Sequence, residues 1–424
     1  MASSHARVWF ITGGSSGLGL ALARRALERG DRVVAAARRL EPLAPLCQAF
    51  PDEVRALSLD VTEPAQILPA AQRALDAFGR VDVLVNNAGA GVLGALEELD
   101  EAQIRRAFEV LFFGPLAVTR ALLPAFRRQR RGHIVNMSAI AGFANELGFS
   151  AYGGAKFALE GASEALRGEL APLGVHVLVV EPGPFRTQFL SAGFERAPRP
   201  IDDYAGTVGA FERFLRQVEG SQPGDPVRAA EAIMLALDAP TPPLRLPLGA
   251  YAYQKARQKI AALTAELDAW EAIGRPTDFD DPPAPLRASY RVPVDAPVER
   301  LWRLLEDKVE NPGPYVPGVT DVRVLARRAD GVSRQMCVGA FVLKEDIQIF
   351  PAQLVIKFAL VDHPLFIGQV MNRVYRPEAG ALAELEFTLH WTPRRPLAAA
   401  ETPDVVALIR HAVQQTKALA EKGD

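Results

Sequence analysis

The sequence predicts an α/β domain built on a parallel sheet, followed by a smaller α+β domain built on an antiparallel sheet. Three observations lead to this prediction. The chain has 424 residues, more than one ordinary hydrophobic core accommodates. Up to about residue 248, continuous apolar runs alternate with amphipathic stretches, as in a parallel sheet covered by helices on both faces. Near the C-terminus apolar and polar residues alternate instead, as in an antiparallel sheet with one face in water.

The first half contains a series of short apolar runs that read as buried strands. Amphipathic stretches separate them, for example SGLGLALARRALERG at 16–30, and a charged helical stretch at 251–274 closes this half. The predicted strands are RVWFIT at 7–12, DRVVAAA at 31–37, VRALSLD at 54–60, VDVLVNN at 81–87, GHIVNMS at 132–138 and VHVLVVEP at 175–182. Together they predict a doubly wound parallel sheet.

A proline- and aspartate-rich segment then breaks the pattern. It predicts a linker at 276–286 between a first domain at 1–275 and a second at 287–424. In the second domain APVERLWRLLEDKVE reads as a helix, and AELEFTLHW, which begins at Ala383, reads as a strand with alternate residues buried. A long amphipathic helix with Thr402 as its N-cap closes the chain.

Composition excludes several classes of protein. The 48 basic residues balance 50 acidic ones, which argues against nucleic acid and against an anionic membrane surface as partners. The two cysteines, Cys47 and Cys337, form no metal-binding pattern, so we expect reduced thiols and no metal site. The N-terminus shows no basic-then-apolar leader, and we expect no apolar run of the roughly 20 residues that span a bilayer. These features predict a cytoplasmic protein.

A glycine-rich turn follows the first predicted strand. TGGSSGLG at 12–19 places Gly13, Gly17 and Gly19 between a strand and a helix. Glycines at such a turn allow the backbone to approach a pyrophosphate, which then lies at the N-terminus of the helix. The spacing is T-G-x-x-x-G-x-G rather than the generic G-x-G-x-x-G. The turn predicts a dinucleotide site, with a plain connection between strand and helix as the alternative.

The end of the second strand indicates which dinucleotide is preferred. An acidic residue there would bind the adenosine ribose hydroxyls, but the chain has Ala37 followed by Arg38 and Arg39. A guanidinium matches phosphate geometry in a bidentate fork. NADP(H) is therefore favoured over NAD(H), the alternative being two arginines that simply face solvent.

Tyr152 and Lys156 are the strongest catalytic candidates. Their i, i+4 spacing places both side chains on one face of a helix. A free phenol titrates near 10, too high for easy proton exchange at neutral pH. A nearby ammonium favours the phenolate, so we expect the Tyr152 pKa to be lowered.

Five motifs in this order make the first half similar to the short-chain dehydrogenase/reductase family, from residue 7 to about 250. They are TGGSSGLG, LDV, NNAG, YGGAK and EPGPFRT. The resemblance implies a Rossmann fold, with Tyr152 as general acid or base and with Lys156 lowering its pKa and binding the nicotinamide ribose. It implies further cofactor contacts from Ser15, Ser16, Leu18, Asp60, Val61, Asn87, Ala88, Gly89, Pro182, Gly183, Phe185 and Thr187.

Two positions depart from that family pattern. The family's catalytic serine, thirteen residues before the tyrosine, is here Ala139, and Ser138 is its neighbour. Successive residues of an extended strand face opposite ways, so Ser138 takes the catalytic place only if the chain bends. An asparagine that holds a water beside the lysine in the family is here Leu111. Losing one hydrogen-bond donor aimed at a developing charge lowers a rate by about 10²–10³.

The second half resembles the START-like helix-grip fold of polyketide cyclases and pollen-allergen-like proteins, over about residues 287–424. That resemblance implies a cavity for an apolar ligand, although the inward leucines and aromatics equally fit a filled core. The leading hypothesis is an NADPH-dependent oxidoreductase for a hydrophobic carbonyl or alcohol. The alternatives are a non-redox cyclase, aldolase or isomerase, and an apolar-ligand carrier. By family resemblance, a homodimer or homotetramer is expected.

Overall fold

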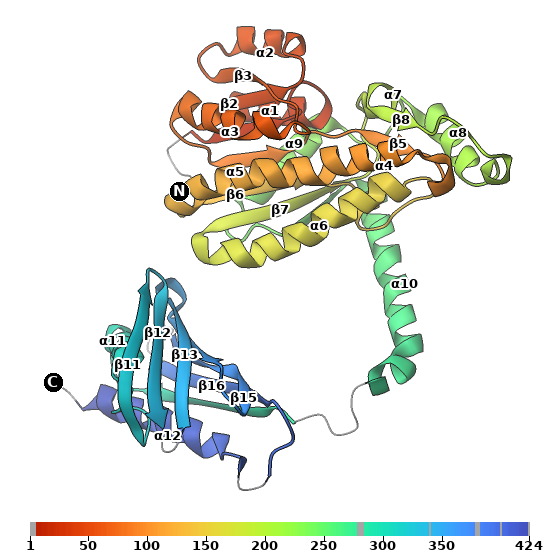
Figure 1. Cartoon of the computed structure of the whole chain (residues 1–424). Coiled ribbons are helices and arrows are strands. Elements are labelled where there is room, and N and C mark those ends of the chain that lie inside the picture. The colour runs from red at the N-terminus through yellow and green to blue at the C-terminus, as the bar shows by residue number, and fades with distance from the viewer. Residues whose placement is uncertain (1–5, 278–283, 339–340, 378–381, 399–400, 423–424) are drawn as a thin grey trace. The chain divides into compact units, whose positions relative to one another are not determined.

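The computed structural model describes residues 6–277, 284–338, 341–377, 382–398 and 401–422 (Figure 1). It divides into two compact units, Met1–Ala269 and Trp270–Asp424. Part of the predicted linker, residues 278–283, lies outside the described residues.

The first unit is built on a parallel sheet. Within the described residues its seven strands lie in the order β3-β2-β1-β4-β6-β7-β9. They span Val8–Thr12 (β1), Arg32–Ala37 (β2), Val54–Ser58 (β3), Val83–Asn86 (β4), Gly132–Met137 (β6), Val175–Pro182 (β7) and Arg245–Leu248 (β9). From β1 the chain adds β2 and β3 on one side, then crosses to the other side of β1 and adds β4, β6, β7 and β9 there. This order confirms the predicted doubly wound parallel architecture.

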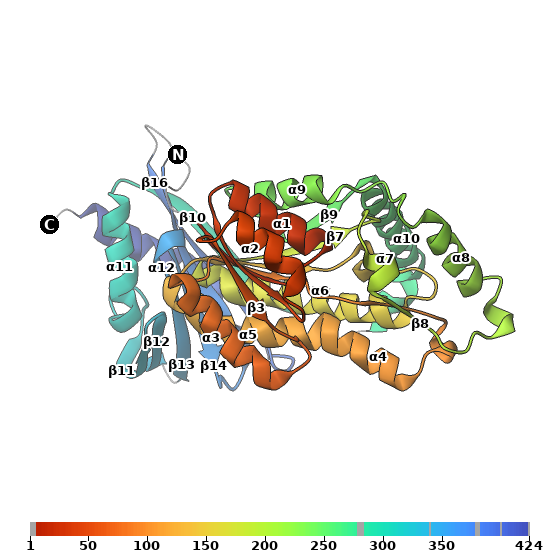
Figure 2. The same cartoon turned by 90° about the horizontal axis from the view of Figure 1, so that it is seen from above.

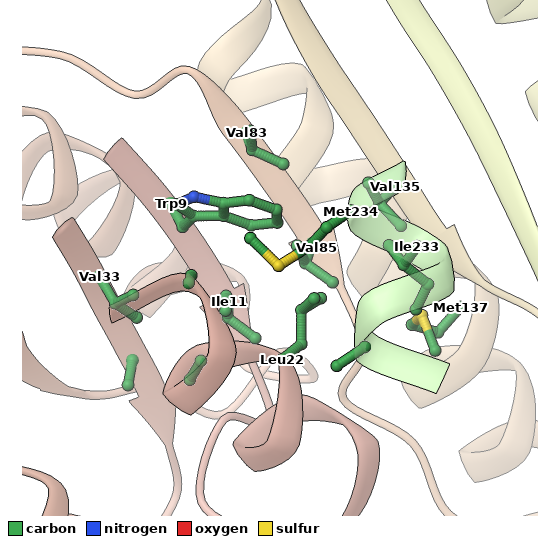
Figure 3. Packing of buried hydrophobic residues seen from close by; sticks show 14 of the residues in the cluster. Trp9, Ile11, Leu22, Val33, Val83, Val85, Val135, Met137, Ile233 and Met234 are labelled. Atoms are coloured by element: carbon green, nitrogen blue, oxygen red, sulfur yellow. The ribbon is translucent and has the colours of Figure 1, made fainter. Parts of the chain in front are cut away.

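Both faces of this sheet are buried, which explains the continuous apolar strands. Trp9 and Ile11 of β1 face one side, where α1 and α9 cover them, and Figure 3 shows Leu22, Ile233 and Met234 in this layer. Phe10 faces the other side, in the core under α3 and α5. Figure 2 shows α1 and α9 on one side of the sheet and α5 on the other. Each strand contributes to a core on both faces of the sheet, so consecutive positions along the strand must be apolar.

The helices of the first unit connect the strands. They are α1 (Gly17–Glu28), α2 (Ala44–Ala49), α3 (Pro64–Phe78), α4 (Glu101–Phe108), α5 (Gly114–Gln129), α6 (Ser150–Leu170), α7 (Phe189–Ala192), α8 (Val208–Val218), α9 (Pro226–Asp238) and α10 (Ala250–Gly274). A π-helical turn, Glu109–Phe113, joins α4 to α5. A short parallel pair, β5 (Gly91–Leu93) with β8 (Phe194–Arg196), lies outside the main sheet.

One prediction about apolar runs is wrong. The helical stretch Glu101–Gln129 is long and apolar enough, by length and composition, to cross a membrane. Its buried residues Val118, Leu122 and Phe126 pack in the core with Phe10 of the parallel sheet. The stretch is thus positioned as a core helix of the α/β unit.

The second unit is built on an antiparallel sheet that packs with helices. Its strands, in the described residues, lie in the order β10-β16-β15-β14-β13-β12-β11. The elements are β10 (Leu286–Val294), α11 (Val298–Glu310), β11 (Val319–Arg328), β12 (Gly331–Val338), β13 (Phe341–Phe350), β14 (Val355–Val361), β15 (Phe366–Tyr375), β16 (Ala383–Pro393) and α12 (Val405–Glu421). The predicted antiparallel sheet is confirmed.

One face of this sheet is buried beneath α12. Leu385, Phe387 and Leu389 of β16 are buried in one cluster with Ile409 and Val413 of α12. They follow the predicted alternation, and the residues between them are half-buried or exposed. The N-cap of α12 is Asp404, which accepts from the Ala407 N–H at 2.9 Å, rather than the predicted Thr402.

Candidate active site

The turn between β1 and α1 leaves no room for a side chain at Gly13 or Gly19. Gly13 has a φ of +64°, and a Cβ there would lie 2.8 Å from Ala88 Cα. A Cβ on Gly19 would lie 2.3 Å from Asn87 Nδ2. Gly17, the first residue of α1, also has a positive φ of +54°. Ser15 and Leu18 are half-buried, and Ser16 is exposed at the N-cap of α1. The backbone N–H groups of the first turn of α1, which have no partner within the helix, therefore lie at this glycine turn.

The segment after β4 is tied to the same turn. The Asn87 amide donates to the carbonyls of Thr12 and Gly13 at 3.0 and 2.9 Å. Thr12 Oγ1 accepts from the backbone N–H groups of Asn87 and Ala88. Sequence reasoning placed Asn87, Ala88 and Gly89 here but gave Thr12 no role. The threonine that precedes the glycines in TGGSSGLG was the available signal.

The loop after β7 approaches the turn from the other side. Gly183 donates its N–H to the Leu248 carbonyl at 3.0 Å, directly after Pro182. Phe185 then packs against Gly224. Thr187 lies 3.6 Å from the place where a Cβ of Gly17 would stand. The structure therefore brings the EPGPFRT motif to the glycine turn.

Four residues lie at the ends of β2 and β3. Arg38 and Arg39 are exposed directly after β2. In the described part of the chain no hydrogen bond or ion pair is recorded for either guanidinium. Asp60 Oδ1 accepts from the N–H and hydroxyl of Thr62 at 3.0 and 2.7 Å, while Val61 is buried against Gly114. These residues occupy the carboxyl end of the sheet, where open α/β sheets bind ligands.

Tyr152 and Lys156 lie on α6, one turn apart, and both are buried. The Tyr152 ring packs between Phe149 and Phe189 with centroid distances of 5.3 and 5.9 Å. Lys156 Nζ donates to the Met137 carbonyl at 2.5 Å and lies 6.0 Å from the Tyr152 ring centre. The ammonium is thus held at the end of β6, on the face of α6 that carries the phenol.

The pKa of the phenol shifts in the direction opposite to the expected one. Burial raises the pKa of Tyr152 above its ordinary value. Burial also lowers the pKa of Lys156 to about 8, against the opposing charge of Glu160. Desolvation of the buried phenol is the dominant effect on its pKa, with the Lys156 Nζ 6.0 Å from the ring centre.

The structure gives Ser138 a partner other than the predicted one. Ala139 is extended, with φ −161° and ψ 162°, so it and Ser138 face opposite ways. Ala139 packs in the apolar cluster that contains Tyr152 and Leu111. Ser138 Oγ instead donates to Glu160 Oε1 at 2.7 Å. The bend that would turn its hydroxyl toward Tyr152 is not present.

Comparison with known proteins fits this geometry. Residues 7–197 match the short-chain dehydrogenase family. Oxidoreductase BOA17 of Botryotinia fuckeliana is 38% identical over 268 residues, 63% of this chain and 97% of that protein. A short-chain dehydrogenase from Streptomyces avermitilis is 46% identical with a TM-score of 0.62, covering 65% of this chain and all of that one.

The chain belongs to the short-chain dehydrogenase family. Two further solved members of that family carry a dinucleotide. The Burkholderia phymatum enzyme, in complex with NAD, is 25% identical with a TM-score of 0.55 and covers 66% of this chain and 99% of that one. The Sphingobium yanoikuyae enzyme, in complex with NADPH, is 26% identical with a TM-score of 0.50 and covers 65% of this chain and 99% of that one.

The dinucleotide implied for a short-chain dehydrogenase fits the residues present. The glycine turn packs against the segment after β4, where a Cβ at Gly13 or Gly19 would collide with Ala88 or Asn87, and this packing fixes the shape of the cradle. The N-terminus of α1 opens onto it, and Thr187 and Asn87 border it. Tyr152 and Lys156 come from α6, which follows β6 in the same sheet. The arrangement can hold a nicotinamide dinucleotide along the carboxyl end of the sheet.

This short-chain dehydrogenase also has a buried acidic network beneath Lys156, which sequence reasoning missed. Arg245 of β9 contacts Glu160 Oε2 at 3.0 Å, Glu181 Oε1 at 3.1 Å and Glu164 Oε1 at 2.9 Å. Burial raises the pKa of Glu160 and raises that of Glu181 to about 7. Two buried carboxyls share one guanidinium, so the network retains a proton near neutral pH. Glu160, four residues after Lys156, was the available signal.

The second unit matches a different family. Residues 296–421 match AtaL, the acetylaranotin biosynthesis cluster protein L family. The sequence predicts a START-like domain here, whereas the family that matches is AtaL. Within the described residues no group of three or more His, Cys, Asp or Glu side chains is placed to hold a metal ion.

Proposed function

We propose that this protein is an NADP(H)-dependent oxidoreductase for a hydrophobic carbonyl or alcohol substrate. The observation that carries the proposal is the pairing of Tyr152 with Lys156 on α6. This helix follows β6 of the sheet whose strand β1 leads into the glycine turn. When bound, a nicotinamide dinucleotide would supply or accept the hydride. Tyr152 would give or take the matching proton at its phenolic oxygen.

Lys156 has a positioning and an electrostatic role in this proposal. Its ammonium is anchored by the Met137 carbonyl and is charged below a pKa of about 8. Once Tyr152 has given its proton to a carbonyl oxygen, the Lys156 ammonium would stabilise the phenolate that remains. Burial in the apolar cluster keeps Tyr152 protonated, the form that would give its proton to a carbonyl oxygen in the reductive direction.

NADP(H) is proposed over NAD(H) because of the charge at the end of β2. Arg38 and Arg39 are exposed there, and the preceding strand residues are apolar. Guanidinium groups bind phosphates in a bidentate fork, so a 2′-phosphate would find its partner here. The substrate side is apolar, since Ala139, Leu111 and Phe189 surround Tyr152. A hydrophobic ketone or aldehyde is therefore the proposed substrate class.

The antiparallel unit is proposed to hold an apolar ligand related to that substrate. One strand, a helix, six further strands and a long C-terminal helix succeed one another in this unit, as in helix-grip, START-like domains. Its interior face is lined by leucines and aromatics, with α12 lying on it. The ligand could be the substrate or the product of the first unit.

A second candidate function is a non-redox enzyme or an apolar-ligand carrier on the same scaffold. Ala139 and Leu111 favour it, because they leave apolar groups at two positions of the family's proton relay. The distinguishing experiment incubates the full chain with NADPH and a panel of hydrophobic ketones and aldehydes. Loss of NADPH absorbance with formation of the alcohol supports the reductase. Bound nucleotide with product of unchanged oxidation level supports the second candidate.

The cofactor preference has its own test. Replacing Arg38 and Arg39 by alanine should weaken NADPH binding by about tenfold or more and leave NADH binding nearly unchanged, since each phosphate contact removed is charge-assisted. Arg24→Ala, at an exposed position of α1, is the matched control. Equal affinities of the double variant and the control for NADPH would contradict the proposed preference.

A further inference from the structure

The long helix α10, whose last residues from Trp270 onward belong to the second unit, carries large apolar side chains that are exposed in the described part of the chain. Ala252 and Ala256, near the start of α10, are buried, and Lys255 forms an ion pair with Glu146 at 2.8 Å. From Ile260 to Gly274 every residue is exposed. Leu267 and Trp270 are 72% and 64% exposed. Figure 1 shows α10 extending away from the parallel-sheet unit. Large exposed apolar side chains grouped on one face mark an interaction surface.

The apolar residues of α10 recur with the spacing of a coiled coil. Intervals of three and four residues alternate along the whole helix, which keeps the stripe on one side over several turns. The residues of this stripe are Tyr253, Ala256, Ile260, Leu263, Leu267 and Trp270. A stripe of this width packs against another helix with the same repeat.

The charges beside the stripe differ between the two ends of the helix. The first half carries Lys255, Arg257 and Lys259, and the second half carries Glu266, Asp268 and Glu271. A second copy of α10 lying antiparallel would place Arg257 and Lys259 of one copy beside Glu271 of the other. A parallel copy would place like charges together. The charge pattern therefore fits an antiparallel pair of identical helices.

We propose that α10 is an interface at which two copies of this chain pack antiparallel. Ile260 lies beside Trp270 of the partner subunit, and Leu263 lies beside Leu267 of the partner subunit. Arg257 then faces Glu271 of the partner subunit, and the two-fold symmetry repeats each contact. The two-fold axis passes between the two helices at the level of Ala265, so residues 260–270 of the two copies lie side by side over about 16 Å at 1.5 Å per residue.

The first test measures the mass of the full chain by sedimentation. Leu267→Glu places a charge in the stripe, whereas Ala265→Glu places the same charge on the opposite side of the same helix, and both keep a good helix former. The mass should halve in Leu267→Glu and stay unchanged in Ala265→Glu. A monomeric wild type at tens of micromolar, or an unchanged mass in Leu267→Glu, would overturn the proposal. Either result is expected if the second unit covers the stripe within one chain.

The second test examines the orientation of the two helices. Arg257→Glu and Glu271→Arg should each raise the dimer dissociation constant several-fold by opposing like charges, and the double variant should restore it. Glu271 also pairs with Arg275, directly after the end of α10, at 2.7 Å, but both are exposed, so that pair adds little. A double variant weaker than either single variant would contradict the antiparallel arrangement.

Discussion

At the scale of single residues, the site combines a pair that the sequence predicted, Tyr152 and Lys156, with contacts around Glu160 that it did not predict. Tyr152 and Lys156 could be read from the sequence, because i, i+4 spacing on a helix fixes their shared face. The role of Ser138 could not, because it depends on the backbone direction at Ala139 and on Glu160 twenty-two residues later. Arg245 comes from a strand far along the chain, so its contact with Glu160 is a property of the fold.

Glu160 is a positioning residue whose charge acts on Lys156. Its carboxylate raises the pKa of Lys156, which burial has lowered to about 8. In Glu160→Gln the Lys156 pKa should therefore fall further, and the ammonium should be lost at lower pH. We expect the alkaline limb of the kcat/KM profile to move to lower pH by about half a unit or more.

The matched control for this change is Glu164→Gln. Glu164 contacts the same guanidinium at 2.9 Å but its side chain is 55% exposed. Its removal should leave the alkaline limb in place. If Glu160→Gln lowers activity equally at every pH, Glu160 supports the structure without tuning Lys156.

At the scale of elements, the strands were predictable and the contacts between helices were not. Trp9, Phe10 and Ile11 must be apolar because β1 is covered on both faces, and that requirement is visible in the sequence. The alternation in β16 is equally direct, because one face is buried by α12. The cap of α12 was misplaced by two residues, since both Thr402 and Asp404 are good capping residues.

The glycine turn between β1 and α1 gives a prediction at this scale. In Gly19→Ala the new methyl group would meet Asn87 Nδ2 and the Gly13 carbonyl at 2.3 and 2.5 Å. The turn must shift, so we expect a loss of stability of about 1–3 kcal/mol and dinucleotide binding at least tenfold weaker. Denaturant unfolding and a fluorescence titration measure the two effects.

Gly161→Ala is the control for that substitution. Gly161 lies within α6, and a Cβ there would meet nothing within 4 Å. Alanine should stabilise the helix by about 0.5–1 kcal/mol, with no change in binding. Tight dinucleotide binding by Gly19→Ala would show that the turn does not form the cradle described above.

At the scale of the whole molecule, the two units have separate cores, so we expect two unfolding transitions.

The buried Lys308 of α11 makes the stability of the second unit depend on pH. It is buried, donates to Asn372 Oδ1 at 3.1 Å and lies 4.0 Å from the Phe387 ring centre. Burial lowers its pKa to about 7, with Arg334 adding to the effect and Glu345 opposing it.

The sign of the resulting pH dependence is fixed by that lowered pKa. In the unfolded chain Lys308 keeps its proton up to about pH 10.4. The free energy of unfolding is therefore lowered by this residue below about pH 7, and the loss shrinks as the pH rises from there to about 10.4. Lys308→Met should therefore stabilise the second unit at pH 6, by on the order of 1–3 kcal/mol, and less at pH 9. Thermal unfolding at the two pH values measures this, with Lys357→Met on β14 as control. Equal effects of Lys308→Met at both pH values would contradict the lowered pKa.

The central claim is that Tyr152 exchanges the proton while the glycine turn binds the dinucleotide. The most direct measurement compares wild type and Tyr152→Phe for NADPH binding and for turnover of a carbonyl substrate identified in the panel. The account predicts unchanged NADPH binding and a fall in kcat of about 10² or more, because only the phenolic proton is removed. Wild-type turnover in Tyr152→Phe would contradict it.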